Sequence, residues 1–332
     1  MDISGVMPGI ELAASVCLRR RVASMFGLKP YNYESFSNHE LLRHAARHGF
    51  GSGPEPGEKA PDFELHSLDG DRVRLSDYEG EKNVVLTFGS ATCPFTASSI
   101  RRLRDLHEAY EDSSDVEFLF VYIREAHPGE KISAHQSMDD KQEAAEIFRD
   151  EEHVEFPIVL DTLDGKVHRK YGKMPNPTYI IDKSGRVAFR SLWSRVTAIS
   201  QALEELLEVQ AERDTEHAIV NGGQDTSVPM GYAILNSHRA LGRGGKQAIR
   251  DFREGLGKPG RIAHTTARVV GPVVLNPGRT FAIAGLTAGV IGAGLYVGYR
   301  LRKARITRSQ DPYHYYSRPE KKGTSEDYAV GI

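Results

Sequence analysis

The chain has few cysteines, and this scarcity limits its chemistry. Only Cys17 and Cys93 occur among 332 residues, which excludes a disulfide-built scaffold and a four-thiolate zinc site. A reactive cysteine is therefore expected to act as a single thiol in a reducing compartment. An excess of one charge is also lacking, since 43 Lys and Arg stand against 45 Asp and Glu. No bulk electrostatic attraction to nucleic acid is expected.

Targeting and metal motifs are missing from the first fifty residues. The basic run 19–21 follows the apolar stretch 10–18 instead of preceding it, which is the wrong order for a secretory signal. A capping box at Ser37 predicts a short helix to about residue 47. Its histidines do not form a His-Glu-x-x-His motif, and an exposed helix face explains them. We therefore expect no metal site and no bound cofactor.

Composition divides the chain into five parts. Residues 1–56 are an N-terminal extension with the short helix and a glycine- and proline-rich linker, and 57–210 are one compact α/β domain. Residues 211–279 lose periodicity and gain glycine, so we expect a poorly packed connector with one helix near 246–254. An uncharged run at 280–299 and a basic tail at 300–332 complete the chain.

Within the compact domain, short apolar runs alternate with helical patterns. The run 84–88 is continuous, as in a strand buried on both faces, and a helix is expected after Pro94. This alternation predicts a mixed sheet with helices on both faces. The remaining expected strands are at 63–65, 73–75, 116–123, 158–160, 178–181 and 187–189, and the remaining helices at 141–148 and 196–209.

The run 280–299 contains 20 residues without a charge, about the ~20 that cross a bilayer as a helix. It predicts a single membrane-spanning helix, and the alternative is a buried helix of a soluble protein. Its small-xxx-small glycine pairs, such as Gly285 with Gly289, permit a homodimer through this helix. The basic tail favours an orientation with the tail in the cytoplasm and the α/β domain on the other side of the membrane. A large domain without an export signal is instead expected to stay cytoplasmic, and we adopt this second orientation.

Cys93 lies where a strand meets a helix, in the segment Phe88-Gly89-Ser90-Ala91-Thr92-Cys93-Pro94-Phe95-Thr96. Pro94 suits the first helical position, so the thiol is expected at the helix N-terminus, where free N–H groups favour a thiolate. Thr96 can offer its hydroxyl to the sulfur. These features favour a nucleophile, and the alternative is an inert buried thiol.

Several segments carry a resemblance to known families. Pro61-Asp62-Phe63, the strand–Cys–helix junction and Pro177-Thr178 resemble the thioredoxin-like redoxins, which include peroxiredoxins. More narrowly, 88–95 resembles the active-site segment of iodothyronine deiodinases, where selenocysteine takes the place of Cys93. The segment 121–128 resembles the Tyr-Ile-Glu-Glu-Ala-His segment of the same family. The similarity spans about residues 57–208 and implies a thioredoxin-like fold with Pro177, cis in such folds or trans as an ordinary turn, near the cysteine.

The resemblance also implies roles for single residues. Cys93 would be the nucleophile, with Ser90 and Thr92 as neighbouring hydroxyls. Tyr122, Glu125 and His127 would form the proton-transferring side of the pocket. The residues themselves agree, because this segment leaves the end of a central strand and a histidine near a carboxylate can donate a proton near neutral pH. A solvated surface loop is the alternative.

Departures from the family pattern qualify the expected chemistry. Cysteine is less ionised than selenocysteine, Phe156 stands where a resolving cysteine can occur, and Arg124 replaces a glutamate. Leu86 replaces the proline of peroxiredoxin active sites. We therefore expect a thiol-dependent oxidoreductase that reduces a small electrophile, such as an organic halide, and is regenerated by an external thiol donor. The alternatives are a hydroperoxide reductase and a non-catalytic, membrane-tethered redoxin scaffold.

Overall fold

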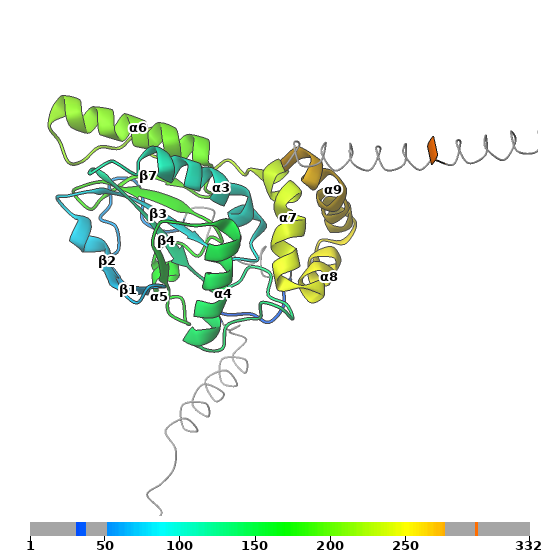
Figure 1. Cartoon of the computed structure of the whole chain (residues 1–332). Helices are drawn as coiled ribbons and strands as arrows, with labels where there is room; N and C mark the ends of the chain where they lie inside the picture. Colours follow the sequence, from blue (N-terminus) through cyan, green and yellow to red (C-terminus); the bar gives the residue numbers. More distant parts are fainter. Residues whose placement is uncertain (1–30, 38–51, 276–295, 298–332) are drawn as a thin grey trace, which may run out of the picture. The chain divides into compact units, whose positions relative to one another are not determined.

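The computed structural model describes residues 31–37, 52–275 and 296–297 (Figure 1). Contacts divide the chain into two units, Met1–Leu275 and Asn276–Ile332, and the first contains the sheet and the helices that surround it. The expected N-terminal helix, Cys17 and the basic tail lie outside the described residues. So does the run 280–299 apart from residues 296 and 297. None of the helices in the described part is long and apolar enough to span a bilayer.

The centre of the first unit is a mixed sheet with the strand order β2-β1-β5-β4-β3-β6-β7-β8. β3 is parallel to β4, and β4 to β5, whereas β6 is antiparallel to both β3 and β7. The sequence predicted this mixed sheet, in which β1 with β2 and β6 with β7 form antiparallel hairpins. The strands are β1 (Glu64–Ser67), β2 (Arg72–Arg74), β3 (Asn83–Gly89), β4 (Val116–Tyr122), β5 (Ile158–Leu160), β6 (Thr178–Ile181), β7 (Val187–Ser191) and β8 (Gln224–Asp225).

Helices cover both faces of the sheet, as predicted. The apolar faces of α3 (Pro94–Ala109), α4 (Met138–Glu152) and α6 (Val196–Arg213) bury one face, and α5 (Lys166–Lys170) packs on the other together with the short 3-10 helix η1 (Leu75–Tyr78). All seven residues of β3 are buried, because its side chains point alternately into the two layers. A cysteine-bearing loop between β3 and α3 completes a thioredoxin-like α/β domain.

The helix expected near 246–254 is present, but the expectation of a poorly packed connector after residue 211 is wrong. The chain forms three helices there, α7 (Met230–Gly244), α8 (Lys246–Gly255) and α9 (Gly257–Leu275), and α7 packs along α3. Figure 1 shows these helices beside the sheet domain, in yellow to brown. The pattern was missed because the residues that α7 buries are mostly small or polar and include Arg243. Such a face lacks the apolar periodicity of an ordinary core helix.

Candidate active site

Cys93 occupies the position that the sequence predicted, at the N-terminus of the helix that follows β3. It is the N-cap residue of α3, with Pro94 as the first helical residue, and its carbonyl accepts a hydrogen bond from the Ala97 N–H at 2.9 Å. The proline suits this place because its missing N–H would have no helical partner. The sulfur therefore lies beside the free N–H groups of the first helical turn.

The thiol is buried rather than poised in solvent. Cys93 is 1% exposed, and burial raises its pKa, although hydrogen bonds from Thr96 and the Phe95 backbone act in the opposite direction. The predicted contact with the Thr96 hydroxyl is present. The predicted preference for thiolate is wrong for this conformation, because desolvation outweighs the helix terminus and the hydrogen bonds.

Glu125 gathers the polar side chains around the cysteine loop. One carboxylate oxygen accepts from the Thr92 N–H at 3.0 Å and the Thr92 hydroxyl at 2.6 Å, and the other accepts from the Tyr122 hydroxyl at 2.5 Å. Burial raises the pKa of Glu125, but His135 and these hydrogen bonds together lower it by more than burial raises it. The pKa of Glu125 is therefore below its usual value. Glu125 is thus a buried, ionised carboxylate next to the residue that precedes Cys93.

Tyr122 and Ser90 form hydrogen bonds between the loop that follows β3 and the loop that follows β4. The Tyr122 hydroxyl accepts a hydrogen bond from the Ala91 N–H at 3.2 Å, and burial raises its pKa well above the usual value. It is therefore a neutral donor to Glu125. Ser90 Oγ accepts from the Ala126 N–H at 3.3 Å. Both loops leave the carboxyl ends of the adjacent parallel strands β3 and β4, which explains why residues far apart in sequence meet here.

His127 lies in this corner, but its ring makes apolar contacts. Its backbone N–H donates to Thr92 Oγ1 at 3.0 Å, while the ring packs against Phe36 and Phe252, with centroids 4.2 and 5.6 Å away. Burial lowers its pKa to about 3, and its Nδ1 has no hydrogen-bond partner in the described part of the chain. The expectation of a proton donor near neutral pH is wrong for this conformation, since the ring is neutral there.

His135 is a site residue that the sequence reasoning missed. It is 2% exposed, and its Nε2 lies 3.4 Å from Glu125 Oε1, an ion-pair distance without an aligned hydrogen bond. The residue comes just before the Ser137–Asp140 capping box that starts α4. That box was a local signal that the preceding residues turn back toward the sheet, but it could not show that they reach Glu125.

Pro177 lies at the carboxyl end of β3, as expected, because β6 begins beside it. Its carbonyl accepts from the Phe88 N–H at 2.9 Å, and the Asn176 side chain donates to the Phe88 carbonyl at 2.9 Å. The described residues contain no cis peptide bond, so the trans alternative holds for Pro177. Phe156, at the place of a resolving cysteine, is a buried core residue.

Helices α7 and α8 cover the cysteine loop. Arg243 Nη1 donates to the Ala91 carbonyl at 3.0 Å, and the Gly244 carbonyl accepts from the Lys131 N–H at 3.1 Å. A Cβ atom added to Gly244 would lie 2.5 Å from the His127 carbonyl oxygen, so only glycine permits this close approach. The gain of glycine after residue 211, which suggested loose packing, therefore includes a residue that lets α7 close the site.

A buried ion pair holds the cover in place. Arg243 pairs with Glu152 of α4, and each side chain is 4% exposed. Arg239, one helical turn earlier, also pairs with Glu152, at 2.5 Å. The i, i+4 spacing of the two arginines was a visible signal, but their acidic partners are about ninety residues away in the sequence.

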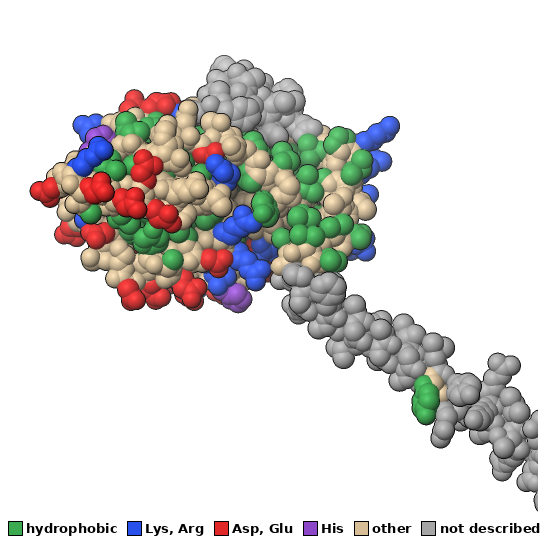
Figure 2. Space-filling view, turned by 90° about the horizontal axis from the view of Figure 1, so that it is seen from above, with side chains coloured by type: hydrophobic (Ala, Val, Ile, Leu, Met, Phe, Trp, Pro, Cys, Tyr) green, Lys and Arg blue, Asp and Glu red, His purple; other side chains and the backbone are tan. Residues whose placement is uncertain are grey.

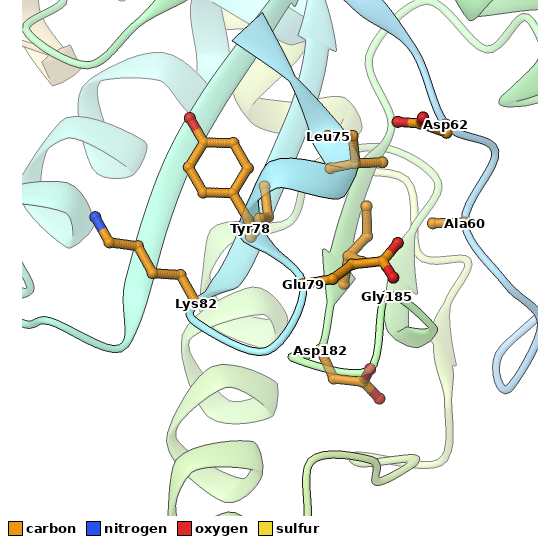
Figure 3. A pocket seen from close by; sticks show the side chains of 10 residues that line it. Ala60, Asp62, Leu75, Tyr78, Glu79, Lys82, Asp182 and Gly185 are labelled. Atoms are coloured by element: carbon orange, nitrogen blue, oxygen red, sulfur yellow. The ribbon is translucent and has the colours of Figure 1, made fainter.

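A pocket seen elsewhere in the unit does not belong to this site. It lies at the opposite end of β3, near Val84, and the side chains around it include Asp62, Glu79 and Lys82 (Figure 3). Its volume is about 10 Å³, roughly the space of one water molecule. No group of three or more potential metal ligands lies together in the part of the chain that the structure describes.

The chain is similar to known proteins over about half of its length. The sequence profile of the iodothyronine deiodinase family matches residues 17–208. Thyroxine 5-deiodinase of Gallus gallus is 32% identical over 42% of this chain and 57% of its own length, and type I iodothyronine deiodinase of Xenopus laevis is 30% identical over 40% and 55%. The chain thus spans little more than half of these relatives. A thiol-disulfide oxidoreductase from Bacteroides fragilis is 17% identical, with a TM-score of 0.37 over 45% of this chain and 99% of its own. Because the profile covers more than half of the sequence, this chain belongs to the iodothyronine deiodinase family.

Proposed function

We propose that this protein is a thiol-dependent reductive dehalogenase in which Cys93 is the nucleophile. The observation that carries the proposal is the contact between the cysteine loop and a buried, ionised carboxylate, Glu125, through Thr92 and Tyr122. Family membership points to iodinated phenols as the substrate class. A single reacting thiol also fits a chain in which no second cysteine is present among the described residues.

The proposed reaction begins with attack of the Cys93 thiolate on the iodine of an aryl iodide. The carbon–iodine bond breaks, its electron pair stays on carbon, and carbon takes a proton, so that a sulfenyl iodide forms on the protein. One external thiol then displaces iodide to give a mixed disulfide, and a second thiol releases Cys93. The carbon is reduced, and the two external thiols become one disulfide.

In this proposal Tyr122, Glu125 and His135 carry the proton toward the reacting carbon. Tyr122 is neutral and already donates to Glu125, and His135 approaches the same carboxylate oxygen. Thr92 holds the carboxylate beside the nucleophile. His127 and the Phe36 and Phe252 rings around it form an aromatic, apolar wall, which suits contact with a substrate ring.

Turnover requires the cover formed by α7 and α8 to move. Cys93 is 1% exposed, so neither an aryl iodide nor an external thiol reaches its sulfur in the closed arrangement. Displacement of Arg243 from the Ala91 carbonyl would hydrate the loop and remove the desolvation that raises the pKa of the thiol. Opening would therefore expose the thiol and favour its ionised form together.

We also propose that residues 280–299 form a single membrane-spanning helix, with the redoxin domain on the cytoplasmic side. The support is the sequence alone, 20 residues without a charge. The glycine pairs in this run permit a homodimer through the helix. Alkaline extraction of membranes tests the anchor, because a spanning helix stays in the pellet and a peripheral protein is released.

The activity is tested with the full chain and a dithiol reductant, measuring iodide release from an iodinated phenol and, in parallel, loss of hydroperoxide. We expect iodide release that disappears in Cys93→Ser and persists in Cys17→Ser. Peroxide loss without iodide release would replace the proposal by a hydroperoxide reductase. Retained turnover in Cys93→Ser would refute the assigned nucleophile, and no turnover of either substrate would favour a redoxin scaffold.

A further inference from the structure

Helix α9 exposes an apolar stripe that the described part of the chain does not cover. Ile262 is 68% exposed and Val269 is 65% exposed, and Val273 continues the same face one helical turn later. Val270 and Val274 widen the stripe. The opposite side of the helix, including His264 and Ala267, packs on α7. An exposed apolar surface of this kind marks an interaction site rather than a core.

Next to this stripe lies a basic cleft between α8 and α9. It has a volume of about 400 Å³. Its lining consists of four cations, one carboxylate and one apolar residue, which are Lys246, Arg250, Arg253, Arg261, Glu254 and Ile249. On α8 the cations follow the helical spacing i, i+4, i+7, so they share one face. Lys258 and Arg268 are also exposed on α9. The cleft therefore presents positive charge beside an apolar helix face.

These cations differ from those of α7. Arg239 and Arg243 are neutralised by Glu152, whereas none of the cations on α8 and α9 forms an ion pair within the described ranges 31–37, 52–275 and 296–297. Figure 2 shows hydrophobic side chains gathered over the helical part, Lys and Arg at its outer edge, and acidic side chains mostly over the sheet domain. The surface is thus both apolar and positively charged.

We infer that α8 and α9 form a docking surface for an anionic lipid bilayer. A helix with an apolar face and flanking Lys and Arg lies in the membrane interface, where apolar side chains enter the acyl boundary and cations meet lipid phosphates. In the sequence, only residues 276–279 separate the end of α9 from the uncharged run 280–299. That proximity favours a lipid surface over a protein partner as the occupant. The docking surface is distinct from the thiol chemistry proposed above.

Docking at this surface would place the active-site cover next to the bilayer. Phe252, on α8 between the cleft residues Arg250 and Arg253, packs against the ring of His127. Glu130 of the active-site loop accepts from the Lys246 N–H at 2.5 Å and the Gln247 N–H at 2.8 Å. An apolar aromatic substrate that partitions into lipid would therefore meet the covered side of the site first.

The test uses the full chain with preformed vesicles of phosphatidylcholine alone or mixed with phosphatidylserine. The readouts are co-sedimentation and amide hydrogen exchange of peptides from 246–275. We expect tighter binding and slower exchange with the anionic vesicles, both weakened by salt. Each cation near an anionic surface adds about fivefold to affinity, so Arg250→Glu/Arg253→Glu should weaken binding by about 25-fold or more. The matched control Lys166→Glu/Arg213→Glu changes the net charge equally, outside the cleft, and should bind much more tightly than that double variant.

Val269→Ser/Val273→Ser provides a second variant that leaves all cations in place, and we expect it to weaken binding while preserving salt dependence. Binding that is equal for both vesicle types would overturn the inference. The inference would also be overturned if the protein co-sedimented with vesicles while amide hydrogen exchange in 246–275 stayed unchanged. In that case residues 280–299 would be the part that binds the vesicles. Failure to bind either vesicle would overturn the docking surface, without bearing on iodide release or on the anchor, which alkaline extraction tests.

Discussion

Replacing Arg243 by Gln should uncover Cys93. The substitution removes the hydrogen bond to the Ala91 carbonyl and the pairing with Glu152, whose side chain stays 4% exposed beside Arg239. Removing one partner of a buried pair costs about 3–5 kcal/mol. The low end applies here, because Arg239 still neutralises Glu152.

A loss of about 3 kcal/mol in the closed arrangement raises the open population by about 100-fold, since each 1.4 kcal/mol is tenfold. Cys93 should therefore react with iodoacetamide about 100-fold faster at neutral pH. Mass spectrometry of the alkylated peptides measures this rate. The alkylation rate of the peptide that contains Cys17 serves as an internal reference for the reactivity of the reagent. Thermal unfolding of the same samples gives the change in global stability.

Arg190→Gln is the matched control. Its side chain is also 4% exposed and pairs with Glu55 at 2.6 Å, on a part of the sheet domain that α7 does not cover. This variant should lose stability without faster alkylation of Cys93. If Arg243→Gln lowered the unfolding temperature while Cys93 reacted at the original rate, α7 would not be the barrier to the thiol, and the reasoning would be refuted.

Three further outcomes are expected. Gly244→Ala should speed alkylation of Cys93, because its Cβ would lie 2.5 Å from a backbone oxygen, whereas Gly242→Ala, with nothing within 4 Å, should not. The pKa of His127 is lowered from 6.5 to about 3 in the folded protein. As pH falls from 6.5 to 3, the unfolded state therefore takes up a proton at His127 before the folded state does, and the free energy of unfolding decreases. In the His127→Phe variant, urea titrations should show a decrease in the free energy of unfolding at acid pH that is smaller by up to roughly 4–5 kcal/mol. An unchanged pH dependence would contradict burial of the ring. Glu125→Gln should lower kcat for iodide release by about 100-fold or more, and unaltered kcat would exclude the proposed proton route.

Much of the sheet domain follows from local patterns in the sequence. The run at β3 is apolar throughout because both faces of a central strand are buried, and the turns at Gly70 and Gly185 adopt the positive φ that glycine permits. The N-cap position of Cys93 also follows locally, from a strand, a short loop and a proline. Neighbours in sequence are sufficient for predictions of this kind.

The helices α7 and α9 could not be predicted in the same way, whereas α8 matches the helix expected near 246–254. Their contacts with the sheet domain depend on buried arginines and glycines whose partners, such as Glu152 and the His127 carbonyl, are distant in sequence. A periodicity argument counts apolar residues, and α7 stabilises its interface with charge pairs and close backbone approach instead. Gly244, one of the glycines that suggested a loose connector, is a residue that permits tight packing.

For the site, the sequence by itself determined which groups are present: one thiol at a helix N-terminus, with Tyr122, Glu125 and His127 at the end of the next parallel strand. Only the tertiary structure decided their protonation and access. It buried Cys93, packed α7 against the loop that precedes it, placed His135 rather than the His127 ring against Glu125, and made His127 neutral. The physical reason is that a pKa depends on desolvation and on charges brought together by the whole fold, and neither can be read from the order of residues along the chain.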